Sequence, residues 1–235
     1  MAPTMPAPST LCAAWARGPA ALPSSTRLPR ARRSRRWRAR ASVACGSILK
    51  PIPRGRFEPA DAKAVLDATA EQIRGLGWHV QIYTRTAVVA GLKDHLARMP
   101  LPVVVDHFGR GNPAQGPGHP DFAALLELVK SGHLYVKISG AYRVSERAPD
   151  FSDVVGLAQA LVAANPDRIV WGSDWPHPNS DAGRGKPLAE ISAPFPIDDG
   201  LLLNQLPKWV PDPAVRKKIL VDNPARLYGF APVAG

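Results

Sequence analysis

The chain of 235 residues carries thirty Lys and Arg residues against nineteen Asp and Glu residues, a formal net charge of +11 at pH 7. Residues 1–57 hold twelve of the basic residues and none of the acidic ones, so residues 58–235 are close to neutral, with eighteen basic and nineteen acidic side chains. No apolar run approaches the ~18 residues of a membrane span. Both cysteines, Cys12 and Cys45, precede residue 58, which excludes a disulfide framework and a cysteine zinc site from the rest of the chain.

The N-terminal segment, residues 1–57, is rich in Pro, Arg, Ala and Ser, and we predict that it is disordered or out of frame. Its run Arg30–Arg38 could hold phosphates, but we favour a solvated basic segment and expect no nucleic-acid partner. The segment also fits an organelle transit peptide with a cleavage region at Ser42–Cys45. In that case the protein enters an organelle, and otherwise we expect it in the cytoplasm.

Residues 58–235 read as one domain in which helical and strand patterns alternate. Apolar periodicity predicts helices over Asp61–Arg74, Thr86–Met99, Asp121–Lys130, Phe151–Ala164, Gly200–Trp209 and Pro213–Leu220. Strands are predicted over His79–Thr84, Leu101–Asp106, Leu134–Ser139 and Arg168–Ser173. A last short helix from Pro224 takes Asn223 as its N-cap. This alternation predicts a parallel sheet or barrel.

Each predicted strand ends in polar residues, and the carboxyl ends of parallel strands meet on one face. The residues are Tyr83-Thr84, Asp106-His107, Ser139 with Tyr142-Arg143, and Ser173-Asp174. A phenol, an imidazole, a guanidinium and a carboxylate suit the hydrolysis of an ester or lactone that carries a negative charge, because they can polarise the carbonyl, activate water and clamp a carboxylate. The alternative for Asp174 is a strand-end residue that only caps the next turn.

Four motifs carry a family resemblance: Val105–Arg110, Val136–Gly140, Val170–Pro178 and Asn223–Phe230. Over roughly residues 58–231 the chain resembles amidohydrolase-related proteins, and it is most similar to 2-pyrone-4,6-dicarboxylate lactonases and related sugar-lactone hydrolases. The resemblance implies a (β/α)8 TIM barrel.

The resemblance also implies roles for individual residues. Asp174 matches the family's water-activating aspartate, and His107 matches the histidine that polarises the scissile carbonyl. Arg143 matches an arginine that binds a substrate carboxylate, and Tyr83 matches a substrate-contacting tyrosine. His177 is expected in the wall of the site. The implied cofactor is either none or one divalent metal of the zinc type, with His107 and Asp174 among its ligands.

The chain departs from the family pattern at its beginning. Its six histidines are residues 79, 95, 107, 119, 133 and 177, so the family's His-x-His motif is absent. A TIM barrel takes about 250 residues, so we expect about the first two βα units to be missing. We therefore predict a lactone hydrolase with impaired activity, acting on a carboxylate-bearing small molecule. A metal-dependent decarboxylase or hydrolase of the same superfamily, or a non-catalytic truncated product, remains an alternative.

A reading-frame error is a second explanation for the basic segment. Relatives carry a strand reading Gly-Val-Arg-Phe-Asn at about this distance upstream, and codons for it read one base later encode Ala44-Cys45-Gly46-Ser47. We expect on this ground that residues 1 to about 48 are not family sequence. The oligomeric state and the identity of the substrate do not follow from the sequence.

Overall fold

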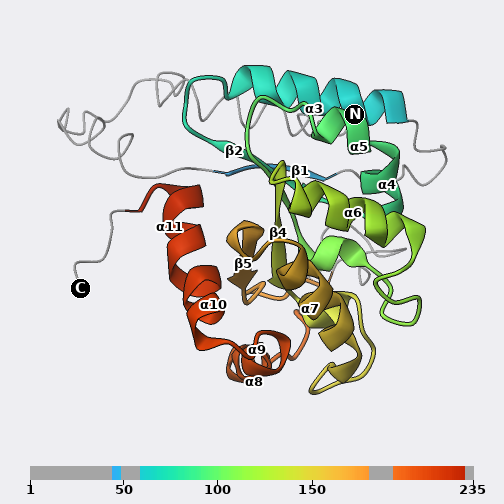
Figure 1. Ribbon diagram of the computed structural model, residues 1–235, viewed down its shortest axis with the longest axis vertical. Coiled ribbons are helices and arrows are strands. Elements are labelled where there is room, and N and C mark those ends of the chain that lie inside the picture. The colour runs from blue at the N-terminus through green and yellow to red at the C-terminus, as the bar shows by residue number, and fades with distance from the viewer. Residues whose placement is uncertain (1–43, 49–58, 180–192, 231–235) are drawn as a thin grey trace.

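The computed structural model describes residues 44–48, 59–179 and 193–230, which are drawn as coloured ribbon in Figure 1. Within this part of the chain, five strands form one parallel sheet, and each strand is hydrogen-bonded to the next in chain order. They are β1 (Ala44–Ile48), β2 (His79–Tyr83), β3 (Val103–Val105), β4 (Leu134–Ser139) and β5 (Ile169–Gly172). The four predicted strands correspond to β2–β5, so the predicted parallel α/β class is confirmed.

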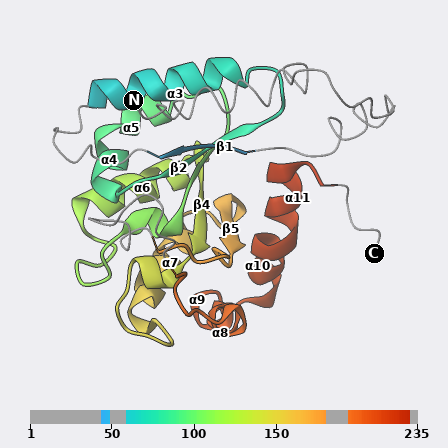
Figure 2. The same cartoon turned by 180° about the vertical axis from the view of Figure 1, so that it is seen from behind.

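Helices connect successive strands, because a parallel connection needs a crossover segment, and they cover one face of the sheet (Figures 1 and 2). They are α3 (Pro59–Gln72), α4 (Thr86–Gly91), α5 (Lys93–Leu96), α6 (Pro120–Lys130) and α7 (Val155–Ala164). Four more helices follow β5 and gather beside it: α8 (Asp199–Asn204), α9 (Leu206–Trp209), α10 (Pro213–Lys217) and α11 (Asn223–Tyr228).

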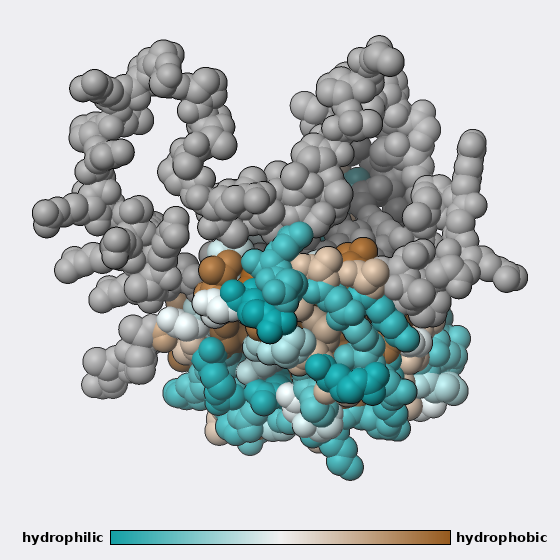
Figure 3. All heavy atoms as spheres, turned by 90° about the horizontal axis from the view of Figure 1, so that it is seen from above, coloured by the Kyte–Doolittle hydropathy of each residue, from teal (hydrophilic) through white to brown (hydrophobic). Residues whose placement is uncertain are grey.

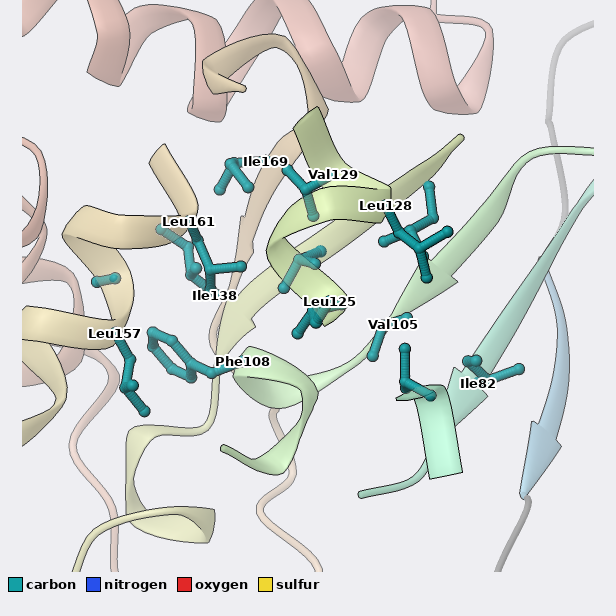
Figure 4. Packing of buried hydrophobic residues seen from close by; sticks show 14 of the residues in the cluster. Ile82, Val105, Phe108, Leu125, Leu128, Val129, Ile138, Leu157, Leu161 and Ile169 are labelled. Carbon is teal, nitrogen blue, oxygen red and sulfur yellow. The ribbon is translucent and has the colours of Figure 1, made fainter. Parts of the chain in front are cut away.

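The main core lies between the sheet and the helices that cover it. Ile82, Val105 and Ile138 point from their strands toward this layer, where Leu125 of α6 and Leu157 of α7 meet them (Figure 4). All five are at most 1% exposed. Burial of such a side chain contributes about 1.5–3 kcal/mol, so this layer holds the strands in place and thereby positions their ends.

The opposite face of the sheet differs along its length, because successive side chains of a strand point to opposite faces. One part is apolar, and its small buried cluster consists of Val104, Tyr135, Val170 and Leu227. Another part is polar. There Gln81 donates a 2.9 Å hydrogen bond to Asp106, and Nζ of Lys137 lies 3.1 Å from the other oxygen of that carboxylate.

The molecular surface drawn in colour in Figure 3 is mainly hydrophilic, with a few smaller apolar patches. Among the residues that the structure describes, no helix is both long and apolar enough to cross a membrane.

Several local predictions about helices are wrong. The helix predicted over Gly200–Trp209 is two helices, α8 and α9. The helix predicted over Thr86–Met99 is two helices, α4 and α5, because Leu92 between them departs from helical dihedral angles (φ −106°, ψ 6°). Asn223 is not an N-cap: its own backbone is helical, and it is fully buried. Its Nδ2 instead donates hydrogen bonds of 2.8 and 2.7 Å to the carbonyls of Pro166 and Ile169, which ties α11 to the start of β5.

Strand β1 lies inside the basic segment, where the sequence suggested no secondary structure. It pairs with β2 in parallel from Ala44 opposite His79 to Ile48 opposite Tyr83. The rest of that segment, including Cys12 and the run of residues 30–38, lies outside the described residues. The division of the chain at residue 57 therefore stays a prediction.

Candidate active site

The strand ends bring the predicted site residues together. Tyr83 is the last residue of β2, and His107 follows β3 by two positions. Arg143 closes a short 3-10 turn, η2 (Ala141–Arg143), after β4, and Asp174 follows β5 by two positions. Because β2–β5 are parallel neighbours, these four side chains converge at one edge of the sheet, as the sequence predicted.

A close approach of three segments at Gly140 shapes the site. Gly140 has a left-handed backbone (φ 55°), and a Cβ atom there would lie 2.9 Å from Oδ2 of Asp174 and 3.0 Å from Nδ1 of His107. The turns that carry two of the candidate residues are also unusual, since His107 and Asp174 have φ values of 52° and 69°. Non-glycine residues adopt such angles at a cost, typically where function requires it.

Asp174 presents its two carboxylate oxygens to different partners. Oδ2 accepts a 2.7 Å hydrogen bond from the Tyr142 hydroxyl and a second hydrogen bond from Nε of Arg143. Oδ1 faces the ring of His107, with 3.7 Å between Oδ1 and Nε2. The side chain of Asp174 is 17% exposed, so the carboxylate is held firmly by one oxygen and remains accessible beside the histidine.

His107 is buried at the centre of the site. Its Nδ1 lies 2.9 Å from Oγ of Ser139, the last residue of β4, and the ring of Tyr83 packs edge-on against it at 5.3 Å. Burial is the largest influence and lowers the pKa of His107 from 6.5, although the carboxylates of Asp174 and Asp106 act in the opposite direction. The imidazole is therefore neutral at neutral pH.

Tyr142 is a site residue to which the sequence assigned no role. Burial, followed by its hydrogen bond to Asp174, raises the pKa of Tyr142 well above 10, so the phenol keeps its proton. For Arg143, burial lowers the pKa, but the hydrogen bond and the negative charge of Asp174 outweigh it and raise the pKa above its usual value. Its sequence signal was its place with Arg143 among the polar residues after the third predicted strand, Leu134–Ser139.

A cavity of 270 Å³ opens beside these residues. Its lining includes Tyr83, Arg110, Tyr142, Arg143 and Phe195. Nη1 of Arg110 donates a 2.8 Å hydrogen bond to the Tyr83 hydroxyl, so Arg110 is a second functional candidate that the sequence analysis quoted within a motif but did not single out. The cavity thus combines two guanidinium groups and three aromatic rings with one carboxylate, that of Glu146.

His177 lies in the wall of the site, packed edge-on against Tyr142 with ring centroids 5.6 Å apart. The other histidines serve elsewhere. Nε2 of His95 lies 3.0 Å from Asp67, and Nδ1 of His119 caps α6 by accepting from the backbone of Asp121.

The described residues do not by themselves fit a catalytic metal. Within them, no group of three or more His, Cys, Asp or Glu side chains could hold a metal ion. His107 and Asp174 supply two ligands, whereas catalytic zinc sites use three from the protein. The guanidinium of Arg143 on Asp174 further opposes a second cation at that carboxylate.

Comparison with known proteins identifies the family of the chain. The family model described as amidohydrolase matches residues 10–230, and the chain belongs to this family. Over 166 residues the chain is 37% identical to the 4-sulfomuconolactone hydrolase of Hydrogenophaga intermedia, covering 71% of this chain and 52% of that protein. The predicted kinship with lactonase-like amidohydrolases is confirmed. The chain spans about half the length of the curated relatives it matches.

Solved structures support the fold. An apo structure from Agrobacterium tumefaciens is 29% identical, has a TM-score of 0.59, and is matched over 79% of this chain and 61% of its own. An amidohydrolase from Burkholderia multivorans with bound zinc is 23% identical with a TM-score of 0.52, over 73% of this chain and 61% of that one. The parallel sheet is thus of the amidohydrolase TIM-barrel type, a superfamily whose members commonly depend on a metal.

Proposed function

We propose that this protein hydrolyses the lactone ring of a small molecule that carries a carboxylate or a similar anionic group. One observation carries the proposal: a carboxylate oxygen of Asp174 and the Nε2 of a buried, neutral His107 face each other at 3.7 Å. Arginines line the cavity next to this pair. The activity named for the 37% identical relative, 4-sulfomuconolactone hydrolysis, is of the same kind.

The chemistry assigns one task to each group of the pair. Oδ1 of Asp174 takes a proton from a water molecule, whose oxygen attacks the lactone carbonyl carbon. His107 donates from Nε2 to the carbonyl oxygen as negative charge develops there, which requires that the Ser139 hydroxyl donate to Nδ1. Collapse of the tetrahedral intermediate breaks the ring C–O bond, and the departing oxygen takes the proton held by Asp174.

The two arginines fit the anionic group of the substrate. Arg143 donates from Nε to Asp174 and from Nη2 to the Pro178 carbonyl, at 3.2 Å. A guanidinium group has five N–H donors, so three of them remain for a substrate. Arg110 donates from Nη1 to the Tyr83 hydroxyl, and its other N–H groups remain available at the cavity that it lines. Guanidinium groups bind carboxylates through paired hydrogen bonds, so we assign Arg110 and Arg143 jointly to substrate binding, with Tyr83 orienting Arg110.

The proposal is tested by assaying ring opening of 4-sulfomuconolactone and 2-pyrone-4,6-dicarboxylate by ultraviolet absorbance. Asp174→Asn should lower kcat by about 10²–10⁴-fold with little change in substrate affinity, because it removes the proton acceptor but keeps the shape. Asp94→Asn, at an exposed position of α5, is the matched control and should leave kcat unchanged. Turnover retained by the Asp174 variant would exclude this role.

A further inference from the structure

The neutral ring of His107 carries a single hydrogen, which can sit on either of its two nitrogens. A neutral imidazole donates from the nitrogen that carries the hydrogen and accepts at the other. With the hydrogen on Nε2, the ring donates on the side of Asp174, whereas with the hydrogen on Nδ1 it presents only a lone pair there. The hydrogen bond made by one nitrogen sets the state of the other, so the surroundings of Nδ1 decide what Nε2 can do.

Two oxygen atoms of Ser139 compete for Nδ1. The backbone carbonyl oxygen lies 3.3 Å from Nδ1 and, because a carbonyl only accepts, favours a hydrogen on Nδ1. Oγ lies closer, at 2.9 Å, and a hydroxyl group can either donate or accept. Ser139 is 1% exposed, and among the described residues Nδ1 is the one partner of its hydroxyl. Because a buried hydroxyl without an acceptor is costly, the hydroxyl donates and Nδ1 accepts.

The contacts on the other side of the ring favour the same tautomer. Nε2 lies 3.7 Å from Oδ1 of Asp174, and a carboxylate oxygen only accepts. A hydrogen on Nε2 therefore points toward negative charge, whereas a lone pair on Nε2 would face the lone pairs of the carboxylate. The ring is held in this orientation, because a Cβ on Gly140 would lie only 3.0 Å from Nδ1 and the Tyr83 ring packs edge-on at 5.3 Å.

We propose that Ser139 is a positioning residue that holds His107 in the tautomer with the hydrogen on Nε2, an inference that rests on the proposed function. Ser139 is buried on the Nδ1 side of the ring, so it acts on the substrate through His107. The hydrogen stays on Nε2 and forms a hydrogen bond to the lactone carbonyl oxygen, and no bond of the ring forms or breaks. In this tautomer His107 has no lone pair on Nε2, so it neither takes a proton nor binds a metal through that atom.

The first experiment determines the tautomer of His107 in protein labelled with ¹⁵N-histidine. Two-bond ¹H–¹⁵N correlation spectra distinguish a ring nitrogen that carries hydrogen from one that does not, and the variant His107→Gln identifies the signals of His107 by their loss. We expect the hydrogen on Nε2 in the wild-type protein. A hydrogen on Nδ1 overturns the proposal without any Ser139 variant, and it is the arrangement of metal-binding histidines, which donate from the nitrogen that does not bind the metal.

The second experiment removes the hydroxyl group. Ser139→Ala keeps the backbone carbonyl near Nδ1, so we expect the hydrogen to move to Nδ1 in most molecules. The matched control is Ser131→Ala, whose hydroxyl donates at 3.0 Å to the Leu128 carbonyl at the end of α6, and it should leave the tautomer unchanged. Thermal unfolding shows whether each variant folds. Ser139→Cys, with its weaker S–H donor, is the second variant and should give a mixture of the two tautomers. A folded Ser139 variant in which the hydrogen stays wholly on Nε2 contradicts the proposal.

Kinetics show whether the tautomer matters for the lactone. Ser139→Ala should lower kcat about 10²–10³-fold, as expected when one donor to the developing oxyanion is lost, with little change in KM. Ser139→Cys should recover part of this loss, and Ser131→Ala should keep the wild-type kcat. A Ser139 variant whose tautomer has changed but whose kcat has not contradicts the positioning role.

The two readouts separate this inference from the proposed function. If the wild-type protein opens no lactone, but His107 carries its hydrogen on Nε2 and loses it in Ser139→Ala, the lactonase assignment fails and the tautomer assignment stands. If the wild-type protein opens lactones with the hydrogen on Nδ1, the lactonase assignment stands and the role of Ser139 fails.

Discussion

Gly140→Ala tests whether the close approach of three segments builds the site. The variant places a methyl group 2.9 Å from Oδ2 of Asp174 and 3.0 Å from Nδ1 of His107. It also forces alanine into a left-handed backbone with φ of 55°. The left-handed conformation costs about 1–2 kcal/mol, and overpacking of a filled site costs about 1–3 kcal/mol. The free energy of unfolding should therefore fall by about 2–5 kcal/mol.

Two other glycines separate these contributions. Gly116 has a similar φ of 71° but no atom within 4 Å of an added Cβ, so Gly116→Ala should cost only the backbone term of about 1–2 kcal/mol. Gly156 lies in α7 with a helical backbone and open space, so Gly156→Ala should stabilise the protein by about 0.5–1 kcal/mol.

Urea unfolding followed by circular dichroism measures all three variants, and the lactone assay measures whether the site survives. Gly140→Ala should also lower kcat, because the methyl group must displace Asp174 or His107. If Gly140→Ala proves no less stable than Gly116→Ala and keeps its activity, the segments do not approach as closely as the structure requires.

Two further predictions concern stability. Burial, reinforced by Lys137, lowers the pKa of His79 from 6.5 to about 4. Between these pH values the unfolded chain binds more protons than the folded one. The free energy of unfolding should therefore fall by up to about 3 kcal/mol as the pH drops from about 6.5 to 4. His79→Phe should flatten that dependence in thermal unfolding curves recorded across this range, and an unchanged slope would exclude His79 as its source. Asn223→Ala should lower the free energy of unfolding by about 2–4 kcal/mol because it removes two hydrogen bonds to buried carbonyls. The control Asn204→Ala, at an exposed site in α8, should change it by less than about 0.5 kcal/mol. Equal losses in the two variants would contradict the tie between α11 and β5.

Much of the fold could be predicted because its signals are local. Short runs such as Leu134–Ser139 are apolar enough to identify buried strands, and the predicted bounds of β4 agree with the structure residue for residue. The polar residues that follow β2–β5 were equally visible. Because parallel strands align their carboxyl ends, this was sufficient to group Tyr83, His107, Arg143 and Asp174 before any coordinates.

Other features depend on contacts between distant segments. Strand β1 has no apolar alternation, and only its pairing with β2 identifies it. Asn223 precedes a proline and resembles an N-cap, yet its partners lie 57 and 54 residues earlier in the chain. Arg110 belongs to the motif Val105–Arg110, and Tyr142 directly precedes Arg143. Their contacts, Arg110 with the Tyr83 hydroxyl and Tyr142 with the Asp174 carboxylate, join distant segments, so neither segment alone reveals them.

The sequence by itself determined the order of β2–β5 and of the helical segments between them. It also determined which polar residues stand at the ends of these strands, and the kinship with lactonase-like amidohydrolases. These follow from periodicity and short motifs, which each segment carries on its own. Only the tertiary structure decided that Asp174 gives one oxygen to Tyr142 and Arg143 and turns the other toward His107. That division depends on the left-handed turns at His107 and Asp174 and on the missing side chain of Gly140, whose effects arise only when three strands pack side by side.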